Sequence, residues 1–168
     1  PSADRRRKPA CIARLLPQLD GELVMFCDVR QRVKRNAARA LAAVLADPDV
    51  GAISGELLLQ ARNGYGRGVD AYCRYEKWIR RLESASGSIV GVTGALYAAR
   101  RDALPDVPAG VILDDMWIPL GVSAAGYRVV FSDEARAHDL ASDAPADGER
   151  RRRRTLAGNL HLLRMWPR

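Results

Sequence analysis

The sequence lacks the features that mark zinc-binding, disulfide-bonded and membrane-spanning chains. Its three cysteines, Cys11, Cys27 and Cys73, are widely spaced and form no C-x-x-C pair, so neither a zinc site nor a disulfide framework is indicated. The longest uncharged apolar stretch, Ile89–Ala99, contains two glycines and a threonine and is shorter than the roughly 20 apolar residues of a membrane helix. No secretory signal is present, and a reducing, cytosolic setting is the default.

Lysine and aromatic residues are also scarce. The 168 residues include 3 lysines against 24 arginines, and aromatic residues make up 6% of the chain. Hydrophobic residues at 48% and charged residues at 28% are ordinary for a folded domain. The length suits one domain or part of one.

The net charge of +7 is concentrated in two clusters, Arg5–Lys8 and Arg150–Arg154, so the body between them is slightly acidic. Such clusters are either solvated faces or contacts for phosphate, nucleic acid or lipid headgroups. A nucleic-acid-binding module would need aromatic residues among the basic ones, and here the aromatic residues lie elsewhere. That function is kept as an alternative.

Hydrophobic patterning predicts alternating strands and helices. The predicted strands are Glu22–Cys27, Val50–Leu59 with a bend at Gly55, Ile89–Ala99 and Arg128–Ser132. The predicted helices are Pro9–Leu19, Val33–Leu45, Val69–Ser86, Asp114–Ala125 and about Glu149–Met165. This alternation is typical of an α/β fold with a largely parallel sheet.

We expect the main folded domain at residues 1–140 and a polar linker at 141–148. An Arg-rich amphipathic helix that suits a membrane interface is expected at 149–168. About four strands are fewer than the five or six of a doubly wound sheet. The chain also begins inside a predicted helix. Both observations indicate a fragment.

The first candidate site is Asp28-Val29-Arg30-Gln31, directly after an apolar strand. Ligands of open α/β sheets bind at the carboxyl ends of strands. A carboxylate there can bind a divalent cation that bridges the phosphates of a nucleotide. Position alone allows a second interpretation, in which Asp28 caps the next helix.

The second candidate is Leu113-Asp114-Asp115-Met116-Trp117. Two carboxylates at the start of a helix suit its positive dipole end, and one of them can also act as a general base toward an acceptor hydroxyl. Trp117 offers a flat face for a sugar ring, although a tryptophan on a helix is more often part of the core.

The third candidate is the arginine run that leads into Thr155. On a helix Arg151 and Arg154 share a face, so they can bind a diphosphate together. The alternatives are a solvated basic face and a docking surface for anionic lipid.

The order of these motifs is more specific than any one of them. Asp47-Pro48-Asp49-Val50-Gly51-Ala52-Ile53-Ser54-Gly55 and Val92–Arg101 lie between Asp28 and the acidic pair, and Arg151-x-x-Arg154-x-x-x-Gly158 follows. In this order, from about Lys8 onward, the chain resembles the inverting family-2 glycosyltransferases with a GT-A fold, a group that includes cellulose, hyaluronan and chitin synthase-like enzymes. The resemblance implies a partial GT-A fold, Rossmann-like, with a mostly parallel sheet and flanking helices. Measured against that family, the chain is expected to lack the N-terminal nucleotide-binding strands and any C-terminal membrane spans.

The resemblance also implies roles for individual residues. Asp115 matches the general base for the acceptor hydroxyl, with Asp114 in place of a neighbouring Glu. Asp28 matches the first Asp of the D-x-D motif, which binds the metal and the donor diphosphate. The other matches are Thr93, Gly94 and Ala95 on the acceptor side, and Arg151 and Arg154 near the diphosphate. Trp117 is assigned to the acceptor side from its position beside the acidic pair.

Three departures from the family pattern bear on chemistry. Arg30 replaces the second Asp of D-x-D, so the implied divalent cation, Mg or Mn, loses a ligand, and Arg30 is expected to contact phosphate. Arg151 and Thr155 replace the Gln and Trp of the family's Q-x-x-R-W motif. These two changes make transfer of one or a few sugars as plausible as long polysaccharide synthesis.

The function expected from the resemblance is inverting transfer of a sugar from a nucleotide-sugar donor to a hydroxyl acceptor. The acceptor would be a polysaccharide or a lipid- or carrier-linked glycan, and the enzyme a larger, membrane-anchored one at the cytoplasmic face of the cell membrane. The fragment itself is expected to be inactive. A catalytically degenerate relative is the other alternative.

Overall fold

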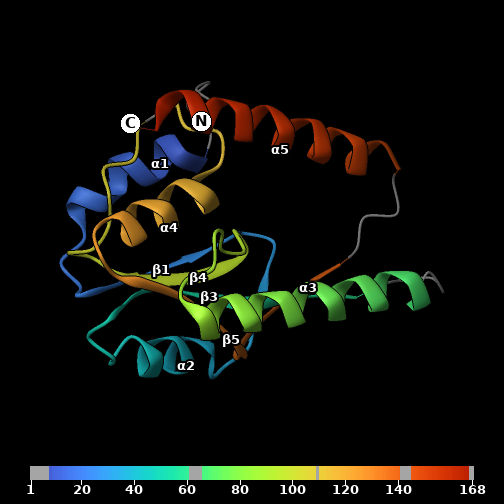
Figure 1. Cartoon of the computed structure of the whole chain (residues 1–168), viewed down its shortest axis with the longest axis horizontal. Helices are drawn as coiled ribbons and strands as arrows, with labels where there is room; N and C mark the ends of the chain where they lie inside the picture. The colour runs from blue at the N-terminus through green and yellow to red at the C-terminus, as the bar shows by residue number, and fades with distance from the viewer. Residues whose placement is uncertain (1–7, 61–65, 109, 141–144, 167–168) are drawn as a thin grey trace.

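The computed structural model describes residues 8–60, 66–108, 110–140 and 145–166. Figure 1 shows a central sheet between two groups of helices. The strands are β1 (Leu23–Cys27), β2 (Arg32–Val33), β3 (Val50–Gln60), β4 (Leu96–Arg100) and β5 (Arg128–Leu140). The helices are α1 (Lys8–Leu15), η1 (Leu16–Gln18), α2 (Ala37–Val44), α3 (Gly66–Ser86), α4 (Asp114–Ala124) and α5 (Pro145–Met165). The expected α/β class is confirmed.

The sheet is mixed, and the expectation of a mostly parallel sheet was wrong. The strand order is β1-β4-β3-β5-β2. Only β3 and β5 are parallel, whereas β1 with β4, β3 with β4 and β2 with β5 are antiparallel.

The reversal of β4 has a local cause in the segment that precedes it. We expected one strand over Ile89–Ala99, but its first half is not a strand. After α3, the backbone N–H of Ile89 donates to the carbonyl of Val129 at 2.9 Å, and the N–H of Thr93 donates to Ser54 Oγ at 2.9 Å. The chain therefore passes from β5 to β3 before a turn, closed by Leu96 N–H to Thr93 O at 3.2 Å, leads into β4.

Two further boundaries differ from expectation. Val33, predicted as helical, lies in the short strand β2, and β5 extends to Leu140 instead of ending at Ser132. α5 begins at Pro145, so the second half of the predicted linker is helical, and residues 141–144 lie outside the described part. The bend predicted at Gly55 coincides with a register shift between Ser54 and Glu56.

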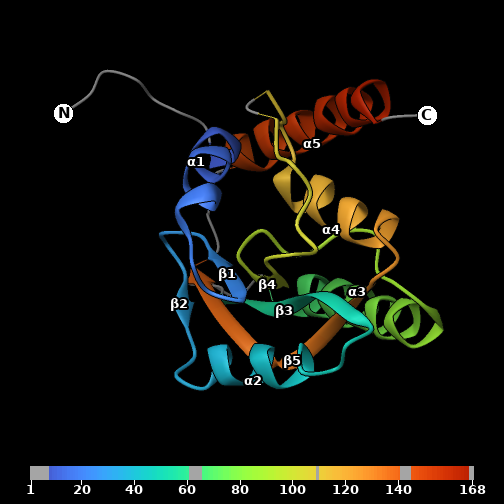
Figure 2. The same cartoon turned by 90° about the vertical axis from the view of Figure 1, so that its left-hand side faces the viewer.

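Alternating side chains give the sheet two apolar faces. Toward α1, α4 and α5, shown above the sheet in Figure 2, the core includes Val24, Phe26, Tyr97, Ala99, Trp117 and Val129. Toward α2, below the sheet, it includes Leu41, Leu45, Ile53, Leu96, Ala98 and Val130. Successive residues of a β-strand point to opposite faces of the sheet. In β4, Tyr97 and Ala99 therefore belong to the core on the α4 side, and Leu96 and Ala98 belong to the core on the α2 side.

A group of charged residues, the bulge cluster, holds α3 against the irregular part of β5. Opposite Gly55, residues 132–135 of β5 bulge out of the ladder, because Ser54 pairs with Phe131 but Glu56 pairs with Arg136. Lys77 lies 2.8 Å from Glu56 and 3.1 Å from Asp133, Arg136 lies 3.1 Å from Glu56, and Arg81 also pairs with Asp133.

Across the part of the chain that the structure describes, no helix is both long and apolar enough to cross a bilayer.

Candidate active site

A cavity of about 860 Å³, here called the charged cavity, opens where β1 ends, beside the turn before β4. β1 and β4 pair so that Cys27 faces Leu96, and the N–H of Asp28 donates to the carbonyl of Ala95 at 3.3 Å. Asp28 therefore lies next to the turn at residues 93–95. The lining includes Lys8, Asp28, Arg30, Gln31, Thr93, Gly94, Ala95, Asp114, Asp115, Asp139 and Arg154.

Lys8, at the start of α1, connects three segments of this cavity. Its Nζ donates to Asp28 Oδ1 at 2.8 Å and to the carbonyl of Gly94 at 2.8 Å. It also lies 3.4 Å from Asp114 Oδ2. Sequence reasoning treated Lys8 only as part of a basic run and missed this role.

Asp114 and Asp115 begin α4, as predicted, and the backbone fixes them beside the turn. The N–H of Val92 donates to the carbonyl of Asp115 at 3.0 Å. Asp114 is 3% exposed, and its buried Oδ2 accepts no hydrogen bond within the described residues. The Lys8 ammonium 3.4 Å away provides charge but not hydrogen-bond geometry.

Burial, followed by the charge of Asp114, raises the pKa of Asp115 above its ordinary value, while Lys8 and Arg154 oppose the rise. A buried carboxylate with a raised pKa is a better proton acceptor than an ordinary surface aspartate. Perturbed carboxylates of this kind cluster at functional sites.

Gly94 allows the close approach of this carboxylate to the turn. A Cβ at residue 94 would lie 3.3 Å from Asp115 Oδ2 and 3.6 Å from Lys8 Nζ. A side chain at this position would therefore crowd the Asp115 carboxylate and touch the Lys8 ammonium at an ordinary contact distance.

Arg154 reaches the cavity from α5, and its Nη2 donates to the carbonyl of Ile112 at 3.3 Å. α5 comes this close because it presents Gly158 to α4, where a Cβ would lie only 2.4 Å from Leu113 Cγ. Arg151 lies in α5, but its side chain is outside the described part of the structure, so its expected contact with diphosphate stays a prediction.

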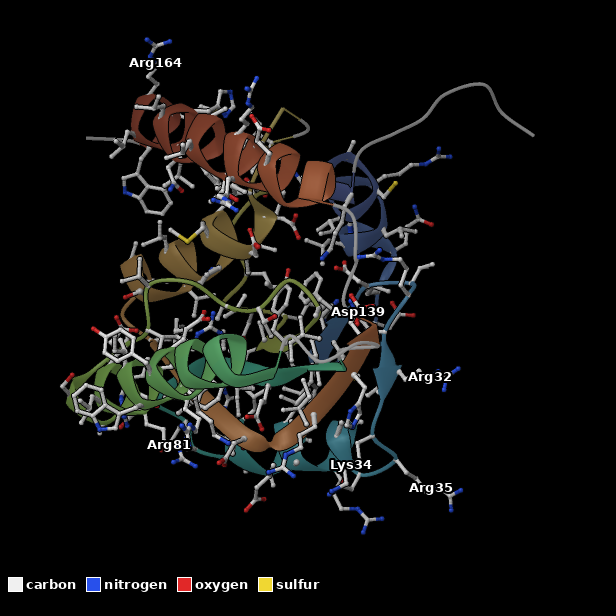
Figure 3. All side chains as sticks on the ribbon, turned by 90° about the vertical axis from the view of Figure 1, so that its right-hand side faces the viewer. Arg32, Lys34, Arg35, Arg81, Asp139 and Arg164 are labelled. Carbon is white, nitrogen blue, oxygen red and sulfur yellow. The ribbon has the colours of Figure 1, made fainter. Side chains whose placement is uncertain are left out.

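Arg30, Gln31 and Asp139 form the far wall of the cavity. Asp139, near the end of β5 (Figure 3), accepts from Gln31 Nε2 at 3.2 Å. Arg30 Nη2 lies 3.5 Å from the same Asp139 oxygen, and the Arg30 side chain is 66% exposed. Asp139 was missed because β5 was predicted to end at Ser132, although the rule that found Asp28 applies equally to a strand that ends at Leu140.

Trp117 does not take part in this site, and its expected role in acceptor binding was wrong. It is 8% exposed and belongs to the core between the sheet and α5. Its Nε1 donates to the carbonyl of Asp106 at 2.8 Å, and its ring meets Trp166 edge-on, with centroids 5.3 Å apart.

A second cavity of about 460 Å³, the side cavity, lies between α3 and α4. Its lining includes Tyr75, Ile79, Val90, Val92 and Met116, with Arg80 and Asn159 among the polar residues. Leu113, Asp115 and Thr155 line both cavities. Asp115 therefore separates a charged cavity from one with apolar walls.

The described residues do not fit a divalent cation held by protein carboxylates. They contain no group of three or more His, Cys, Asp or Glu side chains arranged to hold a metal ion. Lys8 already contacts Oδ1 of Asp28, and Arg30 stands where the D-x-D motif has its second carboxylate. This donor set departs from the oxygen-rich shells that Mg²⁺ and Mn²⁺ prefer.

Comparison with known proteins places the chain in a family. The family described as "Glycosyl transferase family group 2" matches residues 23–168, so the chain belongs to this family of glycosyltransferases. The predicted family-2 membership is confirmed. Comparison with curated proteins finds no match.

Among solved structures, the mannosyltransferase PcManGT from Pyrobaculum calidifontis, solved with GDP-Man and Mn²⁺, is similar in fold, with a TM-score of 0.76 and 23% identity. The match covers 99% of this chain and 46% of that one, so the chain spans less than half of that protein. The expected GT-A type of fold is confirmed.

Two weaker matches are synthases. Mannosyl-3-phosphoglycerate synthase from Rubrobacter xylanophilus has a TM-score of 0.49 and 16% identity, over 92% of this chain and 50% of that one. Glucosyl-3-phosphoglycerate synthase from Mycobacterium tuberculosis has a TM-score of 0.44 and 17% identity, over 88% and 51%.

Proposed function

We propose that this chain is the catalytic part of an enzyme that transfers a sugar from a nucleotide-sugar donor to a hydroxyl group of an acceptor, with inversion at the anomeric carbon. The observation that carries the proposal is the position of Asp115, which lines both the charged cavity and the side cavity. A general base for this reaction must reach the acceptor hydroxyl and face the donor sugar at once.

The charged cavity suits the diphosphate of the donor. Lys8, Arg30 and Arg154 line it and offer cationic N–H donors to phosphate oxygens. Negative charge grows on the diphosphate as it leaves, and positive groups fixed beforehand around that position lower the barrier. A divalent cation is not part of this proposal, because the described residues do not fit one.

Asp115 then acts on the acceptor. The carboxylate takes the proton of the acceptor hydroxyl while the oxygen attacks the anomeric carbon and the bond to the diphosphate breaks. A single displacement from the face opposite the leaving group inverts the configuration. The raised pKa of Asp115 increases its basicity at neutral pH.

The side cavity suits the acceptor. Tyr75, Ile79 and Met116 give it apolar walls, and Asn159 adds an amide. Sugar rings carry apolar faces as well as hydroxyl groups, and pockets of this mixed character bind such ligands. We therefore place the acceptor glycan, free or attached to a lipid or carrier, on this side of Asp115.

The test is Asp115→Asn in the full-length protein. The amide keeps the shape of the side chain but accepts no proton, so transfer from a panel of nucleotide sugars should fall by about 10²- to 10⁴-fold. Binding of GDP or UDP, measured by calorimetry, should remain. The matched control is the exposed residue Asp102, and Asp102→Asn should transfer at the wild-type rate. Retained transfer in Asp115→Asn would remove the base from the proposal, and an inactive wild type would favour the degenerate relative.

We also propose that α5 lies on the cytoplasmic face of the cell membrane. Leu156, Leu160 and Leu163 occupy one face of the helix and are 66%, 66% and 74% exposed. Arg152 and Arg153 are exposed on the same helix, and Arg164 points away from the molecule (Figure 3). Exposed leucines flanked by arginines are typical of helices that bind anionic lipid surfaces.

Sedimentation with phosphatidylglycerol vesicles tests this placement. The double variant Leu160→Glu with Leu163→Glu should lose vesicle binding, because two carboxylates would enter the lipid boundary. Leu82→Glu changes an exposed leucine, 49% accessible, on α3 and should bind as the wild type does. Equal binding by all three proteins would refute the proposal.

A further inference from the structure

We infer that the Lys8 ammonium does the work of the divalent cation in this protein, so that donor binding and transfer need no metal at Asp28. The inference rests on the proposed function, since it concerns how that donor is held. It would make Lys8 a catalytic residue.

The geometry supports a fixed cation at this position. Lys8 Nζ lies 2.8 Å from Asp28 Oδ1, 2.8 Å from the carbonyl oxygen of Gly94 and 3.4 Å from Asp114 Oδ2. These three oxygens come from the end of β1, the turn before β4 and the start of α4. An ammonium has three donors. These contacts fix the position of the group, which still lines the charged cavity.

The charge of Lys8 persists in this environment. Burial alone would lower the pKa of Lys8, but the hydrogen bond to Asp28 and the charges of Asp114 and Asp28 outweigh burial and hold the pKa above its ordinary value. Lys8 is therefore cationic at neutral pH, at which Asp115 is proposed to act as a base.

A divalent cation bound to Asp28 would compete directly with this arrangement. It would bind a carboxylate whose Oδ1 Lys8 already contacts, and it would stand beside a fixed positive charge in a half-buried site, where like charges repel strongly. Arg30 adds a second positive group to the same cavity. The second carboxylate of the D-x-D motif is thus replaced by a cation.

The same cation can serve the reaction. When the acceptor oxygen bonds to the anomeric carbon, its proton passes to Asp115, and the bond from that carbon to the phosphate oxygen breaks. The electron pair stays on the departing nucleoside diphosphate. Lys8 and Arg154, which both line the cavity, balance that charge from positions fixed in advance.

The experiment measures metal binding and diphosphate binding apart from transfer. Mn²⁺ is titrated into wild type, Lys8→Met and Lys8→Arg and followed by electron paramagnetic resonance, and pyrophosphate and GDP are titrated with excess chelator or with Mn²⁺. The matched control is Lys34→Met, because Lys34 is exposed and points outward near β2 (Figure 3).

We expect wild type, Lys34→Met and Lys8→Arg to bind pyrophosphate equally well with chelator and with Mn²⁺. Lys8→Met should bind pyrophosphate at least about tenfold more weakly in chelator, as expected when one charged contact is lost. It should also bind Mn²⁺ more tightly than wild type, because Asp28 and Asp114 are no longer neutralised, and Asp28→Asn should abolish that gain.

The inference is overturned if wild type binds Mn²⁺ through Asp28, or if chelator removes pyrophosphate binding from wild type. If Lys8→Met does not fold, as judged by circular dichroism, the wild-type and Lys8→Arg measurements still decide between the two outcomes. A chain that binds pyrophosphate without metal but transfers no sugar would refute the proposed function and leave the role of Lys8 in anion binding intact.

Discussion

Two groups of charged residues in this molecule use the same side-chain types with opposite results. In the bulge cluster, two carboxylates, Glu56 and Asp133, meet three cations. In the acid cluster, formed by Asp28, Asp114 and Asp115, one ammonium lies within 3.4 Å of two carboxylates, Asp28 and Asp114, and its charge also acts on Asp115. The two clusters differ in the ratio of cations to carboxylates and not in the kinds of charged residue that they contain.

The pKa directions express this difference. The hydrogen bond from Arg81 is the largest influence that lowers the pKa of Asp133, with Lys77 adding to it. Burial raises the pKa of Asp115, and Asp114 adds to the rise. A carboxylate with its charge fully balanced stabilises the fold, whereas one with unbalanced charge retains affinity for a proton. We therefore expect the bulge cluster to serve stability and the acid cluster to serve the proposed reaction.

Among the changes that compare the two clusters, the largest expected effect comes from removing Arg154, a cation that lines the charged cavity beside the acid cluster. Arg154→Ala should lower kcat/KM for the donor by about 100-fold, because one preorganised charge at the leaving group is lost. Arg153→Ala, which changes the neighbouring exposed arginine paired only with Glu149 on the same helix among the described residues, should have little effect. Steady-state transfer assays measure both. Equal losses would mean that the arginines act through the general charge of α5.

On the structural side, Glu56→Gln should lower the free energy of unfolding by about 3 kcal/mol, because Lys77 and Arg136 would lose their shared buried partner. Transfer per folded molecule should stay unchanged. Urea unfolding measures stability, and Glu149→Gln, on an exposed pair, is the control. A loss of transfer at wild-type stability would contradict the division between the two clusters.

The smallest effect concerns pH. Because Asp115 must be deprotonated to act as a base, activity is lost as pH falls through its raised pKa. Asp114→Asn removes a neighbouring negative charge, so the pKa of Asp115 falls and the acid limb of the pH profile of kcat/KM should move to lower pH. Asp106→Asn, at an exposed position, should leave the limb in place. A limb that moves upward would show that another group controls it.

Much of this arrangement could be predicted from sequence because it depends on local order. Asp28 follows an apolar strand and Asp115 begins a helix, and both positions are readable from a few neighbouring residues. Both line the charged cavity, as expected for residues at the ends of elements.

The errors have a common physical origin in long-range packing. Lys8 meets Asp28 across 20 residues and Gly94 across 86, and no local pattern encodes such contacts. The direction of β4 depends on a turn at residues 93–95, inside an apolar run that looks like one strand. For Trp117, the helical pattern left open whether the ring faced the core or the cavity, and its packing against Trp166 decided the matter.

The contact between Gly158 and Leu113 has a consequence for the order of assembly. Lys8, Asp28, Asp114 and Asp115 all precede α5 in the chain, so translation produces the helix that carries Arg154 after them. Until α5 packs against the start of α4, the charged cavity lacks Arg154 as one of its cations. Under the proposed function, the site for the donor diphosphate is therefore completed only when α5 has docked.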